Sequence, residues 1–502
     1  MYLRQSLVFC LLTNCLAQIS AAFQGKLPNI VLILSDDQDV VLNGLTPMTN
    51  VKNFIGLKGA TFENAFTTSP LCCPSRASLL SGQYVHNHRT FNNSLEGGCN
   101  GVHWLSQIEM ETLAPTLKAA GYTNFFAGKY LNQYKGAEVP QGWHKFYGLH
   151  GNSRYYNYTL RENMKNISYS NVYLTDLLRS KVKSFINSQE DHTPFFAMVA
   201  PPAPHAPYTP AERHRNAFSG QGALRTPNFN VIDKDKHWLV SNTELIPNIT
   251  LNLIDSFYQK RWESLLAVDE LVADIVYTLE QKDILENTYI IYTSDNGYHM
   301  GQFAQPYDKR QPYETDIKIP LLIRGPTIPA KVKITAPIAL IDIFPTILEW
   351  LGLPSNPHID GQSINAFLAN APEYDAASDR FYRRSLLVQH FGEGNLNTYK
   401  PECPWSRTDL LAECTVEAAC HCQDSWNNTY SCIRHFGYQT NRLYCEFQDN
   451  EGFVEAYEID QDPYQMHNMV KDMLPIERAL YSLALVNLTK CIGSSSCSDV
   501  IL

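Results

Sequence analysis

The chain has 502 residues, of which 44% are hydrophobic and 18% are charged, and its formal net charge is −10 with its 15 histidines neutral. These values are ordinary for a globular protein and exclude intrinsic disorder. No basic run occurs, so the charge pattern does not favour nucleic-acid binding. The length suffices for one large and one smaller domain.

The first 22 residues have the features of a secretory signal peptide. Arg4 gives a positive start, a short apolar stretch follows, and the small residues Ser20, Ala21 and Ala22 close the segment. A membrane anchor is the alternative, but the apolar stretch is interrupted by polar residues and is too short to cross a bilayer. No other stretch approaches that length, so we expect a soluble mature protein that passes through the secretory pathway.

The chain then alternates between strand-like and helix-like patterns. Short, continuous apolar runs, typical of strands buried on both faces, occupy 29–34, 123–127, 194–200, 288–293 and 319–325. Amphipathic stretches typical of helices lie between them, at 112–121 and 260–281. This alternation predicts an α/β fold in which a large, mostly parallel sheet is sandwiched by helices.

Polar side chains follow four of these runs, where each predicted strand ends. In chain order they are Asp36 and Asp37, then Lys129, then His205, then Asp295 with Asn296. Ligands of such folds bind outside the carboxyl ends of the strands, so we expect these side chains to converge. The aspartates and the asparagine offer hard oxygen ligands that suit Ca²⁺ or Mg²⁺. Either acidic pair alone would be ordinary turn chemistry, but two pairs at two strand ends favour a metal site.

The stretch 71–82, LCCPSRASLLSG, predicts a helix whose start carries unusual chemistry. Pro74 fits the first helical position, and Gly82 fits the stop. A helix N-terminus attracts anions, and Arg76 in the first turn adds a two-pronged donor. Further donors from other strand ends would be Lys129, His205 and Lys309, although His205 or Lys309 alone would be an ordinary surface residue. Together these groups predict a site for a tetrahedral anion, built around a metal and a cysteine.

After about residue 385 the pattern changes to strands with short connections, at 385–392, 430–438, 442–447 and 452–459. We therefore expect a catalytic domain over 23–384 and a smaller antiparallel subdomain over 385–502. Eight cysteines lie in this second part: Cys403, Cys414, Cys420, Cys422, Cys432, Cys445, Cys491 and Cys497. In an oxidising compartment they predict a disulfide framework whose connectivity cannot be read from the sequence.

Two other counts agree with a secreted chain. Six sequons for N-glycosylation occur, at Asn92, Asn157, Asn166, Asn248, Asn427 and Asn487. Outside the signal peptide and the C-terminal part, the cysteines are an odd set of Cys72, Cys73 and Cys99. One member of this set should therefore have a role other than disulfide bonding.

The string Cys72-x-Pro74-Ser75-Arg76, followed by Leu80 and Gly82, resembles the signature of the type I sulfatase family. The resemblance extends over nearly all of the mature chain, through SDDQ (35–38), GKY (128–130), SDNGYHMGQ (294–302), DKRQPYE (308–314), IDGQS (359–363) and YEIDQDPYQMHN (457–468). It implies an alkaline-phosphatase-like sulfatase fold and the hydrolysis of sulfate esters.

The resemblance also implies a modification that spacing alone cannot show. In this family a formylglycine-generating enzyme oxidises the signature cysteine in the endoplasmic reticulum, before folding, so Cys72 would be the precursor of the nucleophile. One Ca²⁺ would be held by Asp36, Asp37, Asp295, Asn296 and the modified residue 72. By the same resemblance, Arg76 would orient the aldehyde hydrate, Lys129 and Lys309 would bind sulfate oxygens, and His205 would protonate the leaving oxygen or hold sulfate.

One position departs from the family pattern. Many members have a histidine two residues after the lysine matched by Lys129, and this chain has Leu131 there, followed by Asn132. That histidine's role is absent, is taken by Asn132, or is supplied by another side chain such as His86, His88 or His299.

Within the family, the chain resembles the branch that removes the 6-O-sulfate from N-acetylglucosamine during the lysosomal breakdown of heparan and keratan sulfate. This implies an exo-acting enzyme with sulfated glycosaminoglycan oligosaccharides as substrates, and His390 and Glu393 are candidate sugar contacts. An acidic chain with many histidines also suits an acidic compartment. A secreted destination and a homodimer stay open.

Four alternatives remain for the function. Extracellular heparan sulfate 6-O-endosulfatases share much of the catalytic sequence but carry a long basic insertion that this chain lacks, and another arylsulfatase-type activity is the second alternative. A phosphate-ester hydrolase of the wider superfamily is disfavoured by cysteine in place of serine or threonine. A catalytically silent glycan-binding protein is supported by the Leu131 departure alone.

Overall fold

The structure is a computed structural model, and it describes residues 26–190, 193–369, 384–393, 425–449, 451–498 and 502. The predicted signal peptide lies outside the described residues. So do four of the C-terminal cysteines, Cys403, Cys414, Cys420 and Cys422.

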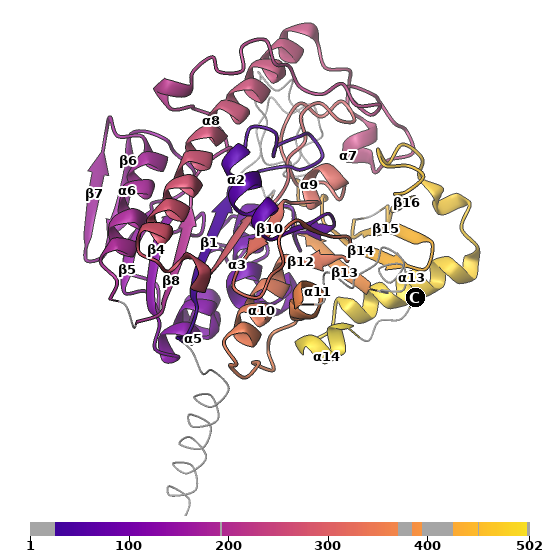
Figure 1. Ribbon diagram of the computed structural model, residues 1–502. Coiled ribbons are helices and arrows are strands. Elements are labelled where there is room, and N and C mark those ends of the chain that lie inside the picture. The colour runs from indigo at the N-terminus through magenta and orange to yellow at the C-terminus, as the bar shows by residue number, and fades with distance from the viewer. Residues whose placement is uncertain (1–25, 191–192, 370–383, 394–424, 450, 499–501) are drawn as a thin grey trace, which may run out of the picture.

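A ten-stranded sheet forms the centre of the molecule (Figure 1). Its middle strand, β1 (Asn29–Ser35), pairs in parallel with β8 (Phe195–Ala200) on one side and β9 (Thr288–Ser294) on the other. Next to β8 lies β4 (Thr123–Lys129), also parallel. Because each predicted apolar run is buried along its length, these runs form the interior of the sheet, as predicted.

The edges of this sheet are mixed. The run at 319–325 forms β10 (Leu321–Arg324), which pairs antiparallel with β9. An apolar run indicates burial on both faces but not strand direction, so the sheet is less uniformly parallel than the sequence predicts. The full order is β11-β2-β10-β9-β1-β8-β4-β5-β6-β7, with β2 at Ala60–Phe62, β5 at Lys145–Leu149, β6 at Tyr158–Glu162, β7 at Lys165–Tyr169 and β11 at Val332–Ile334.

Helices cover both faces of the sheet, as the alternating side chains of β1 show. Ile30, Leu32 and Leu34 pack into a core with α3 (Cys72–Ser81), α5 (Leu113–Ala119) and α10 (Ile343–Trp350). Val31 and Ile33 point to the opposite face and pack with α2 (Thr49–Phe54), α6 (Leu174–Asn187) and α8 (Asn248–Gln281). The long helix α8 crosses this second face diagonally in Figure 1.

The helix predicted from the cysteine–proline stretch begins earlier than expected. Helix α3 starts at Cys72 with Leu71 as its N-cap, so Pro74 is its third residue rather than its first. Proline is tolerated throughout the first turn, because the N–H groups there have no partner within the helix. Gly82 ends the helix in the left-handed conformation, with φ of 69°, as predicted.

A separate four-stranded antiparallel sheet follows in the order β13 (Arg384–His390), β14 (Tyr430–Gly437), β15 (Thr440–Phe447) and β16 (Val454–Glu458). Its four strands match the four predicted runs, and a disulfide joins Cys432 to Cys445 across β14 and β15. A second disulfide, Cys491–Cys497, follows α13 (Pro475–Leu488). Because the core of this sheet includes Phe66 and Tyr84, the sheet packs directly on the larger part of the molecule. The domain boundary at residue 385 stays a prediction.

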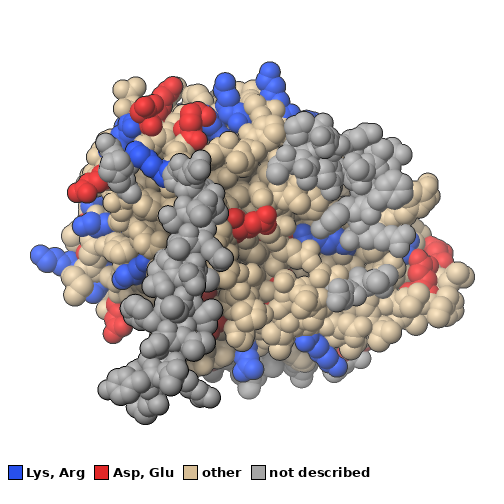
Figure 2. Space-filling view, turned by 60° about the horizontal axis from the view of Figure 1, so that its bottom comes forward, with Lys and Arg blue, Asp and Glu red and all other residues tan. Residues whose placement is uncertain are grey.

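The remaining helices and strands are short. They are β3 (Ala65–Phe66), β12 (Ile338–Ala339), α4 (Val85–His88), α7 (Trp238–Ser241), α9 (Glu314–Ile317), α11 (Asn365–Ala369) and α14 (Gly493–Ser498). On the face shown in Figure 2, acidic and basic side chains are interspersed, and neither sign forms a continuous patch over the described residues. Within the described part of the chain, no helix combines the length and the hydropathy needed to cross a bilayer.

Candidate active site

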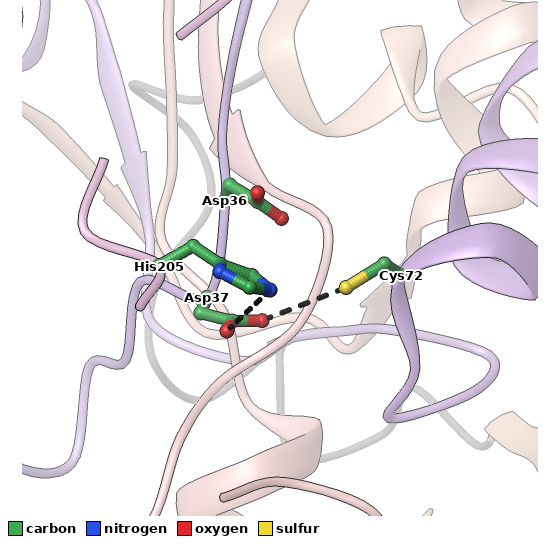
Figure 3. A group of neighbouring side chains, drawn as sticks. All are labelled: Asp36, Asp37, Cys72 and His205. Carbon is green, nitrogen blue, oxygen red and sulfur yellow. Dashed lines mark hydrogen bonds and ion pairs between the residues drawn. The ribbon is translucent and has the colours of Figure 1, made fainter. Parts of the chain in front are cut away.

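Side chains from four strand ends and from helix α3 converge at the carboxyl edge of the large sheet. Ligand atoms of Asp36, Asp37, Cys72 and His205 all lie within 4.8 Å of one another (Figure 3). The sequence places these residues up to 169 positions apart, and the parallel order of the strands brings them together.

Asp36, directly after β1, is fully buried among cations. Lys129, at the end of β4, donates to both of its carboxylate oxygens at 2.9 and 2.8 Å, and Arg76 Nη2 lies 3.1 Å away. Ser153 donates a further hydrogen bond to Oδ2. Burial raises the pKa of Asp36, but Lys129, His205 and Arg76 outweigh it and hold this pKa well below its ordinary value. The carboxylate is therefore charged at any pH above the ordinary pKa of an aspartate.

Asp37 lies opposite Cys72, with Oδ1 at 3.8 Å from Sγ. Its backbone is left-handed, with φ of 64°, a conformation that costs energy for a residue with a Cβ. Lys309 donates to Oδ2 at 2.8 Å, and His205 Nε2 lies 3.7 Å from the same oxygen. Burial raises the pKa of Asp37, while Lys309 and His205 lower it and prevail. Arg261, from α8, donates to the Asp37 carbonyl at 2.7 Å and so supports the left-handed backbone.

Asp295 and Asn296 follow β9, on the other side of β1. Asp295 Oδ2 accepts a hydrogen bond from Arg76 Nε at 2.8 Å, and burial raises its pKa to about 7. Asn296 donates from Nδ2 to Asp37 Oδ1 at 2.8 Å. Its Oδ1 is buried and has no hydrogen-bond partner in the described structure. An orphaned buried acceptor beside three carboxylates is where a cation would be expected.

Cys72 is the first residue of α3, and its thiol points across the site towards Asp37, at 3.8 Å between Sγ and Oδ1 (Figure 3). Among the cysteines that the structure describes, it alone is outside a disulfide, because Cys73 is bonded to Cys99. This accounts for the odd cysteine of the sequence. Burial raises the pKa of the Cys72 thiol to about 12, so the unmodified side chain is a neutral thiol rather than a thiolate.

His205 lies in the loop after β8. Its Nδ1 donates to the Ala206 carbonyl at 2.7 Å, which leaves Nε2 facing the Asp37 carboxylate. Burial lowers the pKa of His205 to about 4, against the opposing effect of Asp37 and Asp36. The neutral ring therefore presents Nε2 to the site as the atom that can exchange a proton.

The donor set fits a hard divalent cation. Three aspartate carboxylates and one amide oxygen are the ligands that Ca²⁺ prefers, and they are buried at two adjacent strand ends. When all three aspartates are ionised, their charge is balanced by three cationic side chains, Arg76, Lys129 and Lys309. Since a divalent cation would give this balanced cluster a positive charge, the same site would then attract an anion.

The four candidate substrate contacts lie in different settings. Asn132 is buried, and its Oδ1 has no hydrogen-bond partner among the described residues. The His299 side chain bonds through Nδ1 to Asp316 at 2.9 Å, in the segment that follows Lys309. His390 is fully buried at the end of β13, and both of its ring nitrogens lack a partner in the described structure.

Glu393 differs from these three, because both of its carboxylate oxygens are engaged within the protein, by the backbone N–H of Asn93 and the guanidinium of Arg310. The prediction of a sugar contact at Glu393 is therefore not what its geometry favours. A carboxylate whose two oxygens both accept hydrogen bonds within the protein mainly holds those donors in place.

The sequons divide into two groups. The side chains of Asn157, Asn166, Asn248 and Asn487 are exposed, and a glycan has room there. Asn92 and Asn427 are 8% and 7% exposed, and the Asn92 amide donates to the Gly392 carbonyl. These two asparagine side chains are packed in the folded chain, which does not favour glycosylation at either position. A sequon does not encode such packing.

Three residues of the site were missed by the sequence reasoning. Arg261 reaches Asp37 from the amphipathic helix 260–281, and its sequence neighbourhood, which holds other charged residues, does not single it out. Ser153 and Asn93 gave no signal, because each acts through a contact with a residue that is distant in the sequence.

Comparisons with known proteins agree with this geometry. The sulfatase family pattern matches residues 28–353. N-acetylglucosamine-6-sulfatase of Homo sapiens is 42% identical over 501 residues, which cover 97% of this chain and 89% of that one. The extracellular sulfatase SULF-1 homolog of Drosophila melanogaster is 38% identical over 353 residues, 69% of this chain and 32% of that longer one.

Among solved structures, one similar protein is in complex with "its substrate D-Glucosamine-2-N, 6-O-disulfate". It superposes with a TM-score of 0.68 at 22% identity, covering 93% of this chain and 97% of the other. This likeness confirms the predicted alkaline-phosphatase-like fold. The sulfatase pattern, the near full-length relatives and the convergent site together establish that the chain belongs to the sulfatase family of hydrolases.

Proposed function

We propose that the chain is an exo-acting sulfatase that removes the 6-O-sulfate from terminal N-acetylglucosamine 6-sulfate of heparan and keratan sulfate. The observation that carries the proposal is the free, buried Cys72 at the start of α3, facing Asp37. The relative named N-acetylglucosamine-6-sulfatase, which matches over almost the whole of both chains, supports the choice of substrate.

The environment of Cys72 supports its conversion to formylglycine. A thiol whose pKa is raised to about 12 is a poor nucleophile at acidic pH, so the unmodified cysteine would be inert. In the modified protein, the position of Sγ stands for the oxygens of the aldehyde hydrate. The hydrate supplies two hydroxyl groups, one to attack sulfur and one to expel the sulfate afterwards, so that no separate water attacks sulfur.

The other side chains have roles that follow from their positions. Lys129 and Lys309 bring two ammonium groups to Asp36 and Asp37, the carboxylates beside the nucleophile, where they can bind the sulfate. Arg76 holds the Asp36 and Asp295 carboxylates with its guanidinium, at the two strand ends that face the nucleophile. Because Nδ1 carries the proton of the neutral ring, His205 Nε2 would first take up a proton from solvent and then pass it to the departing sugar oxygen. The balanced result is one sulfate ester and one water converted into an alcohol and inorganic sulfate.

One calcium ion completes the proposed site. Asp36, Asp37, Asp295, Asn296 and the modified residue 72 would hold it, and it would supply charge for polarising the sulfate and for activating the attacking hydroxyl. The orphaned Asn296 Oδ1 supports this assignment.

The proposed setting is the lysosome, reached through the secretory pathway, with secretion as the alternative destination. The formylglycine-generating enzyme would be a partner during synthesis, and a homodimer is proposed without a defined interface. The chain's acidic charge and many histidines support an acidic compartment.

The first experiment measures inorganic sulfate release at acidic pH from an oligosaccharide that ends in non-reducing N-acetylglucosamine 6-sulfate. Internally 6-sulfated heparan and Cys72→Ala protein are run beside it. We expect release from the terminal sugar only, abolished by the substitution. Cys72→Ala is a clean variant, because it leaves the Cys73–Cys99 disulfide intact.

Mass spectrometry of residue 72 decides how the other outcomes are interpreted. Release from internal residues would make the chain an endosulfatase. No release despite formylglycine at residue 72 would contradict the glycan assignment. If the protein were active with an unmodified cysteine at residue 72, the assignment of formylglycine as the nucleophile would be contradicted.

A further inference from the structure

Glu393 lies where the C-terminal sheet meets two parts of the catalytic site. It follows the end of β13, and its side chain is 14% exposed. One carboxylate oxygen accepts a hydrogen bond from Arg310 Nη1 at 2.7 Å, and the other accepts from the backbone N–H of Asn93 at 2.6 Å. A largely buried carboxylate with a partner on each oxygen holds those partners in fixed relative positions.

On one side, Glu393 reaches the nucleophile helix through a single residue. Asn93 Oδ1 accepts the backbone N–H of Cys73 at 2.9 Å, in the first turn of α3. Cys73 is also covalently bonded to Cys99, so this turn is held both by the disulfide and by the Asn93 contact. Because Cys72 precedes Cys73 directly, the placement of the nucleophile depends on this chain of bonds.

On the other side, Glu393 reaches Lys309 through Arg310. Arg310 has φ of 96°, a left-handed region that a residue with a side chain rarely occupies. Its carbonyl accepts hydrogen bonds from Tyr430 Oη at 2.9 Å and Asn428 Nδ2 at 3.2 Å, both from the C-terminal sheet region. A strained backbone persists only where surrounding contacts stabilise it, and the hydrogen bonds from the C-terminal region stabilise Arg310 in this conformation.

These contacts close into a ring. Cys72 Sγ lies 3.8 Å from Asp37, Asp37 is bonded to Lys309 at 2.8 Å, and Lys309 adjoins Arg310. From Arg310 the path returns through Glu393 to the nucleophile helix. We propose that Glu393 is a positioning residue that fixes Lys309 and residue 72 relative to each other, and that the C-terminal sheet is thereby a working part of the active site. This inference rests on the proposed function, in which Lys309 and residue 72 act on the same sulfate.

The test compares Glu393→Gln with a matched variant at the opposite end of the same strand. Glutamine keeps the shape but has no charge and only one acceptor oxygen for the two donors, Arg310 and the Asn93 N–H, so the bridge between them is broken. Arg384→Gln removes a similarly buried ion pair, to Asp342 at 2.7 Å, at the first residue of β13 and away from the ring. Both variants lose one ion pair of the C-terminal sheet, and only one of the two pairs belongs to the ring.

Two probes distinguish positioning from sugar binding. Methylumbelliferyl sulfate has no sugar, and a methylumbelliferyl glycoside of N-acetylglucosamine 6-sulfate has one. We expect Glu393→Gln to lower kcat by about 10- to 100-fold on both probes with KM nearly unchanged, since misplacement by about 1 Å can cost about 100-fold. Arg384→Gln should keep the kcat of the parent enzyme. A loss confined to the sugar probe, or no loss, would overturn the proposal.

Hydrogen–deuterium exchange gives a readout that does not depend on turnover. In Glu393→Gln, the peptide at the start of α3 should exchange faster than in the parent or in Arg384→Gln, because Asn93, whose Oδ1 accepts the Cys73 N–H, is no longer held by the carboxylate. Unchanged exchange would contradict the proposed coupling even if the chain proved to have no sulfatase activity. The failure of this inference and the failure of the proposed function are thus separable.

A second variant guards against misfolding of the first. Asn93→Ala removes the acceptor of Cys73 and leaves the Glu393–Arg310 pair in place, and it keeps the Asn92 sequon. It should also lower kcat equally on both probes, by less than Glu393→Gln. Parent-like kcat in this variant would show that the connection from Glu393 to the nucleophile helix does not matter.

Discussion

Two clusters of ion pairs in this molecule have nearly the same bond lengths and very different surroundings. At the active site, Lys129 and Asp36 lie 2.8 Å apart and are fully buried. On the outer face of α6 and α8, Arg213 and Asp176 lie 2.7 Å apart with 39% and 36% of their side chains exposed. The outer cluster also includes Arg179, Lys183, His214, Glu270 and Asp274.

The comparison teaches that distance alone does not tell what an ion pair does. Exposed pairs of this kind stabilise a fold by at most about 1 kcal/mol, since water and salt screen them. Burying charges costs several kcal/mol per ion, so a fold rarely gains by it. A buried cluster of three carboxylates and three cations is therefore better explained by chemistry than by stability.

The largest expected effect is the loss of one buried partner. Lys129→Met leaves Asp36 buried beside fewer cations, and we expect the free energy of unfolding to fall by about 3–5 kcal/mol. Arg213→Met in the outer cluster should cost less than about 1 kcal/mol. Urea unfolding of both variants measures the difference, and equal costs would show that burial does not separate the two clusters.

Calcium sharpens the same contrast. Calcium at about 100 times its Kd should stabilise the parent protein by about 2.7 kcal/mol, because it binds the folded state alone. Asp37→Ala removes a proposed ligand and should abolish this increase, whereas Asp176→Ala in the outer cluster should keep it. The measurement is the Tm with excess calcium and with a chelator. A calcium response that survived in Asp37→Ala would remove Asp37 from the proposed metal site.

A smaller effect is expected at Arg261, which has a close counterpart on the surface. Its guanidinium lies 4.2 Å from the Tyr298 ring centre, and Arg225 lies 4.2 Å from that of Phe229. Arg261 is 2% exposed and supports the Asp37 backbone, while the Arg225 side chain is 46% exposed. Arg261→Gln should cost about 1–3 kcal/mol and weaken calcium binding. Arg225→Gln should do neither, and calcium titration followed by unfolding checks both variants.

The smallest effect concerns pH in the outer cluster. Burial raises the pKa of Asp274, but hydrogen bonds from Arg179 and Lys183 outweigh it, so the pKa lies below its ordinary value of 3.8. A depressed pKa means stability that is present above pH 3.8 and is lost as the pH falls through the folded-state pKa. Asp274→Asn should therefore cost below about 1 kcal/mol at neutral pH and less below pH 4. If the loss of stability caused by Asp274→Asn grew as the pH fell, the depressed pKa of Asp274 would not explain it.

The sequence predicts the interior of the large sheet better than its edges. Continuous apolar runs identify β1, β4, β8 and β9, and the polar residues after them form the site. The direction of β10 depends on which neighbour it pairs with, and an apolar run does not carry that information. The C-terminal strands are separated by short connections, so the four strands that the structure describes there could be predicted, though not their order in the sheet.

The supporting residues of the site were harder to predict, for a related reason. Asp36, Asp37, Asp295 and Cys72 belong to short motifs whose chemistry is local in the sequence. Glu393 acts on Asn93, which is 300 positions away, and a single carboxylate looks the same whether it binds a sugar or a neighbouring loop. Residues that position other residues are defined by tertiary contacts, and the sequence alone does not show those contacts.

The burial of Cys72 beside a disulfide-bonded neighbour has a consequence for biosynthesis. Both Cys72 and Cys73 are 0% exposed in the folded chain, so no modifying enzyme could reach the thiol once α3 has docked. Before that moment, Cys99 can pair with either of two adjacent thiols, and a shift of one residue would consume the nucleophile's precursor. If Cys72 is converted as proposed, the newly made polypeptide would face a kinetic competition between oxidation of Cys72 and mispairing with Cys99. The yield of active protein would then depend on the relative speed of these two reactions rather than on the stability of the finished fold.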